Sequence, residues 1–420
     1  MADIFEKKIF SSFQALRHRN FRLFWFGQCI SLIGSWMQNI GQAWLVLQLT
    51  HSAFKLSLVT AMQFLPMMFF ALYAGTLVDR FPKRKVLIFT QSSLAVLAFI
   101  LASITFFNVV QYWHLLVLAL FLGIINTLDM PTRQSFFIEL VGRKDLMNAI
   151  ALNSSIFNLA RIIGPAVAGL LIGLVGIAIC FYINAISFLA VIAALWMINL
   201  PDRVIEKKKI RSFKEIRSDI NEGLMYIKRK EIIKLPLILL ALISTFVMNF
   251  NVLVPVFAQQ ELSQNAAGYG LMMTCMGIGS FVGALAIAAN SSANPRQKYL
   301  VGGAGGMSLF LLILGFEKSF WLACITLFII GFCLIIFTAL VNSIIQLNSE
   351  DYMRGRVLSV YSLVYGGVMP IGSLFAGNLA EFAGIPVCLI ISGTIGLIAT
   401  SYTIFRFQKK RKMENETNLL

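Results

Sequence analysis

The sequence predicts an all-α membrane protein in which twelve transmembrane helices form two pseudo-symmetric six-helix bundles. Three observations support this fold class: the composition, the number of long apolar segments and an internal repeat. Of the 420 residues, 58% are hydrophobic and only 13% are charged, and the mean hydropathy is +0.80. A soluble domain of this composition would expose far too much apolar surface to water.

Twelve segments are apolar and long enough to cross a bilayer, whose hydrocarbon core requires about 20 residues per helix. Six of them precede a polar segment and six follow it. We expect the first six spans at 22–48, 55–78, 86–107, 112–134, 146–174 and 177–198. We expect the last six at 235–259, 267–289, 299–316, 319–346, 356–380 and 385–406. No cleavable signal is expected, because the first apolar segment is too long and no small-residue cleavage site follows it.

These spans divide the chain into five parts. An amino-terminal segment at 1–21 precedes the first bundle at 22–198, and a basic linker follows at 199–234. The second bundle occupies 235–406 and a basic tail occupies 407–420. Apolar residues recur at helical spacing in the linker, which predicts an amphipathic helix on the membrane surface. We interpret this helix as a spacer with a lipid-anchored face, and a regulatory docking site is the alternative.

The basic residues are distributed asymmetrically along the chain. Nearly all of the 35 Lys and Arg lie in the amino terminus, the even-numbered loops with the linker, the tail or the span ends beside them; Lys55 and Lys318 fall outside, and Arg161 lies within a span. This asymmetry follows the positive-inside rule and predicts that both termini are cytoplasmic. The same asymmetry explains the net charge of +16, because the basic residues lie at the cytoplasmic surface of the lipid bilayer. No nucleic acid partner is therefore expected.

The two halves of the chain share an internal repeat. A shift of 208 residues aligns IIGPAVAGLLIGLVG at 162–176 with PIGSLFAGNLAEFAG at 370–384. Span five is therefore repeated as span eleven. A duplication of six spans is typical of transporters in which two bundles move around a site near the membrane midplane.

Polar residues form a stripe along the first span. Five of them recur at spacings of three and four residues: Gln28, Ser31, Ser35, Gln38 and Gln42. Glycines recur every seven residues beside them, at Gly27, Gly34 and Gly41, which predicts close packing on the neighbouring face. We favour a hydrated cavity as the environment of the polar stripe, with hydrogen bonding between helices as the alternative. Asn249 in span seven is a weaker counterpart.

Arg161 lies near the middle of span five, where a charged side chain costs at least ~2.5–3.5 kcal/mol. We expect it to face the bundle interior or a cavity and to be paired with cargo, with a carboxylate or with carbonyls freed near Pro165. Asn158, one turn earlier, is assigned to the same cavity.

Asp129 is the acidic residue placed well inside a span, and Arg133 follows it by one helical turn. An i,i+4 ion pair and a proton-coupling role are both open for this carboxylate. The six Cys and three His show no metal-ligand spacing, so we expect neither a metal site nor a disulfide.

Several motifs resemble the major facilitator superfamily, in particular the drug-efflux branch that contains the enterobactin exporter and macrolide-efflux proteins. They are NFRLFWFGQCISLIGSWM at 20–37, AGTLVDRFPKRK at 74–85, DMPTRQSFF at 129–137, NAIALNSSIFNLARIIGPAVAG at 148–169 and RGRVLSVYSL at 354–363. The resemblance covers nearly the whole chain.

The resemblance implies roles for two of these motifs. The loop after span two would latch the halves through Asp79, with Gly75 allowing close helix approach and Arg80 and Arg84 holding the loop at the surface. Arg354 and Arg356, at the start of span eleven, are the partners expected for Asp79. The antiporter motif of span five is matched by small residues and a proline: Ala160, Gly164, Pro165, Ala168 and Gly169.

The resemblance further implies an efflux transporter, not an enzyme, that exports an amphipathic small molecule by alternating access. The expected cargo is siderophore-like or drug-like, and the expected energy source is a proton gradient used in antiport. No phosphate-binding loop is present, so ATP and other cofactors are not expected. We expect a monomer in the bacterial inner membrane. Two alternatives are a non-transporting sensor or assembly protein with the same fold and an uptake symporter.

Overall fold

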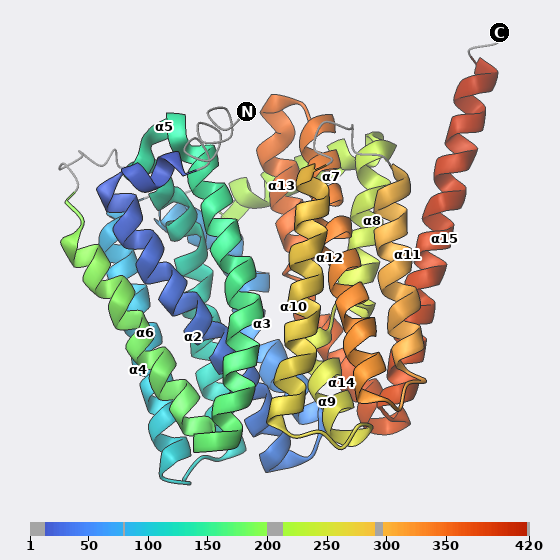
Figure 1. The fold of residues 1–420 in the computed structure, drawn as a ribbon. Helices are drawn as coiled ribbons and strands as arrows, with labels where there is room; N and C mark the ends of the chain where they lie inside the picture. Colours follow the sequence, from blue (N-terminus) through green and yellow to red (C-terminus); the bar gives the residue numbers. More distant parts are fainter. Residues whose placement is uncertain (1–12, 79, 200–212, 290–296, 418–420) are drawn as a thin grey trace, which may run out of the picture. The chain divides into compact units, whose positions relative to one another are not determined.

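The structure is a computed structural model that describes residues 13–78, 80–199, 213–289 and 297–417 (Figure 1). Over these residues the chain consists of helices joined by short turns and contains no β-strand. The predicted all-α class is therefore confirmed.

Packing divides the chain into two compact units. Unit 1 comprises Met1–Leu49 and Leu65–Arg211, and unit 2 comprises Thr50–Phe64 and Ser212–Leu420. The second transmembrane helix thus begins in unit 2 and ends in unit 1, although all of it lies in the first half of the sequence.

Unit 1 is built mainly from long helices that run side by side (Figure 1). Its elements are η1 (Gln14–Arg17), α2 (Arg19–Thr50), the later turns of α3 (Ala53–Val78), α4 (Lys83–Phe106), α5 (Tyr112–Val175) and α6 (Ile177–Met197). Helix α5 contains the fourth and fifth expected spans. They meet at Gly142, whose φ of 71° and ψ of 179° depart from helical geometry. A residue with a Cβ adopts this conformation only with strain, so glycine allows the chain to turn here.

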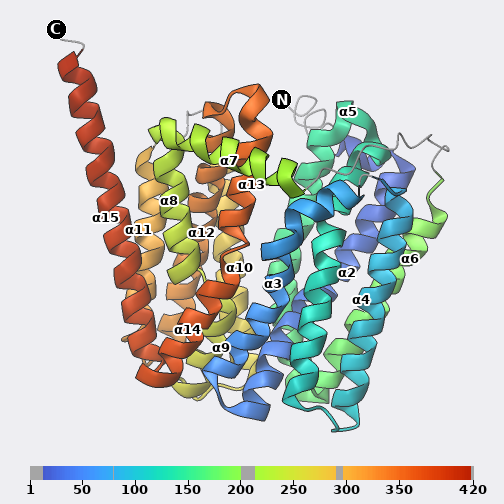
Figure 2. The same ribbon diagram turned by 180° about the vertical axis from the view of Figure 1, so that it is seen from behind.

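Unit 2 contains the first turns of α3, the linker helix and the second set of spans, seen from behind in Figure 2. Its elements are α7 (Phe213–Arg229), α8 (Glu231–Phe246), α9 (Phe250–Gln260), α10 (Ala266–Ala289), α11 (Gln297–Leu314), α12 (Phe320–Asn348), α13 (Asp351–Tyr365), α14 (Met369–Ala383) and α15 (Ile385–Thr417). Spans seven and eleven are each interrupted, at 247–249 and 366–368. Helix α15 extends past the expected end of span twelve into the basic tail.

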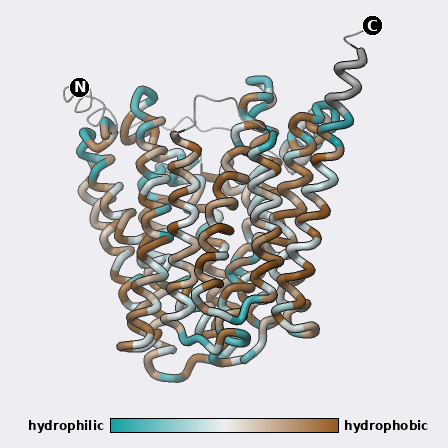
Figure 3. The backbone as a smooth tube through the Cα atoms, turned by 45° about the vertical axis from the view of Figure 1, so that its right-hand side comes forward, coloured by the Kyte–Doolittle hydropathy of each residue, from teal (hydrophilic) through white to brown (hydrophobic). Residues whose placement is uncertain are grey.

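Each of the twelve expected spans coincides with one of these helices or interrupted helices. Among the described residues, ten segments are long and apolar enough to cross a membrane, and α5 counts once among them although it covers two spans. Helix α2 matches the first span in position but is not among the ten. It carries the polar stripe. Figure 3 shows hydrophobic residues along the helices and hydrophilic residues mainly at their ends, the pattern that a bilayer requires.

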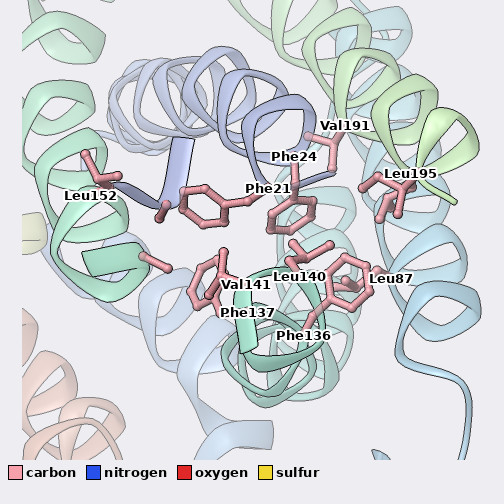
Figure 4. Close-up of a cluster of buried hydrophobic side chains, with 13 residues drawn as sticks. Phe21, Phe24, Leu87, Phe136, Phe137, Leu140, Val141, Leu152, Val191 and Leu195 are labelled. Carbon is pink, nitrogen blue, oxygen red and sulfur yellow. The ribbon is translucent and has the colours of Figure 1, made fainter. Parts of the chain in front are cut away.

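A cluster of buried aromatic and aliphatic side chains joins one end of α2 to α4, α5 and α6 in unit 1 (Figure 4). The rings of Phe24 and Phe136 meet edge to face with centroids 5.3 Å apart, and those of Phe21 and Phe137 are 6.0 Å apart. Each such pair contributes about 0.5–1.5 kcal/mol beyond the area that it buries. The cluster fixes the register between α2 and α5, which together carry most of the candidate site.

The glycine stripe of α2 packs against α6. A Cβ on Gly34 would lie 2.6 Å from Ser187 Oγ, and one on Gly27 would lie 3.0 Å from the carbonyl oxygen of Ala190. Gly41 lies against the ring of Phe181. The predicted close packing beside the polar stripe is therefore present.

Candidate functional site

A buried ionic cluster lies between α2, α4 and α5 of unit 1. Asp129 on α5 is 2% exposed. Its Oδ1 accepts hydrogen bonds from Thr90 Oγ1 at 2.7 Å and from Gln91 Nε2 at 2.8 Å, both on α4. The guanidinium of Arg133, one turn along α5, donates to Asp129 Oδ2 and to Gln28 Oε1 on α2. Two neighbouring helices therefore supply partners to one ion pair of α5, in a segment where isolated charges are costly.

The cluster is not fully saturated. Gln28 Nε2, Gln91 Oε1 and Arg133 Nε are buried and have no hydrogen-bond partner among the described residues. Buried polar atoms without partners cost about 1–3 kcal/mol each, so such atoms usually have a function or bind water. Two donors and one acceptor of the cluster are thus without a partner in the described part of the chain.

The structure corrects the expected environment of the polar stripe on α2. Four of its five side chains are buried: Gln28, Ser31, Gln38 and Gln42. Gln28 bonds to Arg133, and Gln38 Oε1 accepts a hydrogen bond of 2.7 Å from Asn184 Nδ2 on α6. Ser35 is partly exposed and donates to the carbonyl of Ser31 on its own helix. Gln28 and Gln38 therefore form hydrogen bonds between helices, which was the alternative to a hydrated cavity. They can do so because neighbouring helices present polar partners at the same level.

Arg161 lies beside two aromatic rings of unit 1. Its guanidinium carbon is 5.4 Å from the ring centroid of Trp36 on α2 and 5.4 Å from that of Phe157 on α5. The two rings are themselves 5.8 Å apart, edge to face. Cation–π contacts of this kind are worth about 0.5–2 kcal/mol, with the larger values in dehydrated surroundings. The expected interior environment of Arg161 thus includes aromatic partners that the sequence analysis did not name.

The antiporter motif forms the contact that positions Trp36. Gly164 lies one turn after Arg161, and a Cβ there would be 2.4 Å from Trp36 Cβ. All five motif residues are buried: Ala160, Gly164, Pro165, Ala168 and Gly169. The small residues therefore allow α5 to approach α2 closely. Asn158 is partly exposed and donates to the carbonyl of Ser154 at 3.0 Å.

Asn249 lies at the interruption between α8 and α9 in unit 2. It is 3% exposed, and its Nδ2 donates to the carbonyl of Thr245 at 2.7 Å. Its Oδ1 has no hydrogen-bond partner among the described residues and would lie 2.8 Å from a Cβ on Gly372 of α14. Asn249 is therefore packed at a helix break and does not line an open space.

The residues expected to form a latch bond to partners in their own unit, as far as the structure describes them. In unit 1, Arg84 donates from Nε to the carbonyl of Leu195 at 2.7 Å and from Nη2 to that of Trp196 at 3.0 Å, at the end of α6. A Cβ on Gly75 would meet no described atom within 4 Å, and the close helix approach expected there stays a prediction. Arg80 is partly exposed.

In unit 2, Arg356 binds the linker helix. Its Nε donates to Asp219 Oδ1 at 2.9 Å and its Nη1 lies 3.0 Å from Glu222 Oε2, both on α7. Arg354 pairs with Asp351 on its own helix at 2.6 Å. Asp79 lies outside the described residues, so its pairing with Arg354 or Arg356 stays a prediction.

The sequence analysis missed several polar residues of the site. Thr90 and Gln91 on α4 hold Asp129, and Asn184 on α6 holds Gln38. These residues could have been identified from the sequence, because each is a polar side chain inside an otherwise apolar span. Such residues usually face the protein interior.

Comparison with known proteins agrees with this architecture. Residues 10–419 match the family described as transmembrane secretion effector. The chain is 25% identical over 399 residues to the staphyloferrin A transporter of Staphylococcus aureus, a match that covers 94% of this chain and 98% of that protein. It is 26% identical over 363 residues to the multidrug efflux pump Tap of Mycolicibacterium fortuitum, covering 84% of this chain and 87% of that protein.

The fold is also similar to that of a solved transporter. Nucleoside transporter NupG has a TM-score of 0.72 at 12% identity, covering 92% of this chain and 99% of NupG. At this identity the likeness concerns the fold alone. Since the family match spans nearly the whole sequence, the chain belongs to the transmembrane secretion effector family of the major facilitator superfamily.

Proposed function

We propose that this multi-pass membrane protein is a proton-coupled efflux transporter of the bacterial inner membrane. It exports an amphipathic small molecule by alternating access, in antiport with protons, and acts as a monomer without ATP or another cofactor. Both termini are cytoplasmic, as the distribution of basic residues indicates. The observation that carries the proposal is the buried Asp129 cluster, an ionisable site inside the spans of a chain from a secretion family.

The Asp129 cluster supports proton coupling by its geometry. The charged carboxylate accepts bonds from Thr90, Gln91 and Arg133. When Asp129 takes up a proton, it loses its charge attraction to Arg133, and the guanidinium becomes available to other acceptors. Release of the proton restores the ion pair. Protonation therefore changes which helices the Arg133 guanidinium connects.

The surroundings of Arg161 support a neutral or acidic cargo. The Trp36 and Phe157 rings offer apolar surface to a bulky molecule, and the guanidinium offers donors to a carboxylate or another acceptor. A hydrophobic cation would be repelled by Arg161. The names of the relatives agree with this class, since one is a staphyloferrin A transporter and another a multidrug efflux pump.

Comparative metabolite profiling tests the proposed direction and cargo class. Cells with and without the protein are compared for compounds inside the cells and in the medium. We expect a compound that accumulates inside on deletion and returns to the medium when the wild-type protein is restored. Depletion inside the cells would instead support uptake, and an unchanged profile would support the non-transporting sensor.

A further inference from the structure

Helices α10 and α12 of unit 2 are packed with their backbones in contact. A Cβ on Gly279 of α10 would lie only 1.9 Å from the carbonyl oxygen of Phe328 on α12. A Cβ on Gly331 of α12 would lie 2.0 Å from the carbonyl oxygen of Met276 on α10. Real side chains do not fit at such distances, so the two helices are held at a separation that only glycine allows.

This packing fixes a register that brings two cysteines together. Gly279 faces Phe328 and, one turn later, Gly283 faces Phe332. The helices therefore run in the same direction, and these two contacts share one sequence offset. One turn before the first of these contacts, the same offset places Cys275 opposite Cys324. The two side chains interact with each other, and neither cysteine is in a disulfide.

One member of the pair is accessible to small molecules. Cys275 is partly exposed, as Cys29 is, whereas Cys324 is buried like Cys180, Cys333 and Cys388. Cys275 lies in the third turn of α10 and Cys324 in the second turn of α12. With both termini cytoplasmic, these turns lie in the outer half of the membrane, where a lipid-soluble oxidant can reach Cys275.

We propose that Cys275 and Cys324 form a reversible dithiol–disulfide site that joins α10 to α12 upon oxidation. The two thiols give up two electrons and two protons, and one S–S bond forms. The acceptor is a membrane-soluble two-electron oxidant of the quinone class, which becomes the quinol. A disulfide requires Cα atoms within about 4.4–6.8 Å, and helices in backbone contact bring facing residues to this separation. The site is independent of cargo and of proton coupling.

The test is oxidation of the full-length protein in native membranes with diamide, a diazene that accepts two electrons and two protons as the quinone does. We expect mass spectrometry to find peptides that contain Cys275 and Cys324 joined to each other, with a loss of two free thiols per chain. Dithiothreitol should restore both thiols. Absence of this linkage, or linkage of other cysteines to the same extent, would overturn the proposal.

Matched variants separate the site from general thiol oxidation. Cys275→Ser and Cys324→Ser should each abolish the linkage, whereas Cys333→Ser, which alters a buried cysteine elsewhere on α12, should retain it. The unfolding temperature of the wild-type protein is a second measurement, which does not depend on whether the cysteine variants fold. The oxidised wild-type protein should unfold at a higher temperature than the reduced protein, because the cross-link restricts the unfolded chain. A lower unfolding temperature after oxidation would show that the native register does not fit a disulfide and would overturn the proposal.

Discussion

Asp129 and Arg133 show how one ion pair is made tolerable inside a membrane. The carboxylate is 2% exposed and accepts bonds from two helices, α4 and α5, while the guanidinium extends the network to Gln28 on α2. At the scale of single residues, the pairing compensates the two charges, and the unsaturated atoms around them leave room for a change of protonation.

Substitution of one member of this pair should destabilise the protein more than substitution of both members. Arg133→Gln leaves the Asp129 carboxylate buried without its cation, which costs about 3–5 kcal/mol of stability for buried pairs in soluble proteins. The double variant Asp129→Asn with Arg133→Gln should recover most of that loss. Thermal unfolding in detergent of the wild-type protein, both single variants and the double variant measures the coupling. Additive effects of the two substitutions would contradict a compensated pair.

Arg161 should recognise cargo through the shape of its guanidinium. Arg161→Lys keeps the charge but loses the planar group that lies beside the Trp36 and Phe157 rings. We expect cargo affinity to fall by about tenfold, which corresponds to ~1.4 kcal/mol, with unchanged expression. Trp36→Phe is the control, since it keeps an aromatic face. Equal affinity of Arg161→Lys and the wild-type protein in a binding titration would refute the role in recognition.

Glu317 should make the stability of unit 2 depend on pH. It lies in the turn between α11 and α12, where burial raises the pKa of its carboxyl, and a hydrogen bond from Thr326 opposes that rise. The pKa of Glu317 in the folded state lies above its value of about 4.3 in the unfolded state. The stability that the neutral carboxyl allows is therefore complete below that unfolded value and is lost as the pH rises through the folded-state pKa.

The comparison with Glu317→Gln isolates this effect. The variant should unfold at a higher temperature than the wild-type protein at pH 8, and the difference should shrink as the pH is lowered toward 4.5. Unfolding curves over this range provide the measurement. A difference that does not change with pH would exclude Glu317 as the source.

At the scale of helices, glycine decides which pairs approach closely. Gly34 of α2 meets α6, Gly164 of α5 meets α2, and Gly279 of α10 meets α12. Without a hydrophobic driving force between helices in lipid, close backbone contact and van der Waals packing hold such pairs together. The glycines therefore place the helices that carry Asp129, Arg161 and Cys275.

Two Gly→Ala substitutions should have opposite effects on the stability of the protein. Gly279→Ala introduces a Cβ 1.9 Å from the carbonyl oxygen of Phe328, so α10 and α12 must move apart. We expect a loss of about 1–3 kcal/mol, as for other overpacked sites. Gly302→Ala on α11 meets no described atom within 4 Å and should stabilise the helix by about 0.5–1 kcal/mol. Equal unfolding temperatures for the two variants would show that the close contact carries no energy.

The sequence predicted the helices well and their interruptions poorly. Each expected span coincides with a helix because a stretch of about 20 apolar residues has few other stable forms in a bilayer. The breaks at 247–249 and 366–368 leave hydropathy unchanged, so apolar length does not reveal them. The glycine stripe of α2 was predictable from its spacing. The aromatic partners of Arg161 were not, because they depend on how α2 is rotated against α5.

At the scale of the whole molecule, the family match establishes a membrane transporter fold, and the site residues suggest what it is used for. The polar stripe of α2, expected to face water, instead ties α2 to α5 and α6. Unit 1 thus holds a hydrogen-bonded cluster around the Asp129 carboxylate and a separate pair formed by Gln38 and Asn184. This arrangement suits a protein that changes conformation when a proton binds.

The most direct test of this account is cargo and proton flux in inside-out membrane vesicles with an acidified interior, using the compound that metabolite profiling identifies. The wild-type protein should accumulate the compound inside the vesicles and release protons when the compound is added. Asp129→Asn should do neither above the level of vesicles without the protein. Asp145→Asn changes a partly exposed carboxylate that is paired with His18 just after the Gly142 break of the same long helix, and it should behave as the wild type. Accumulation by Asp129→Asn at the wild-type rate, or movement of the compound out of the vesicles, would contradict the account.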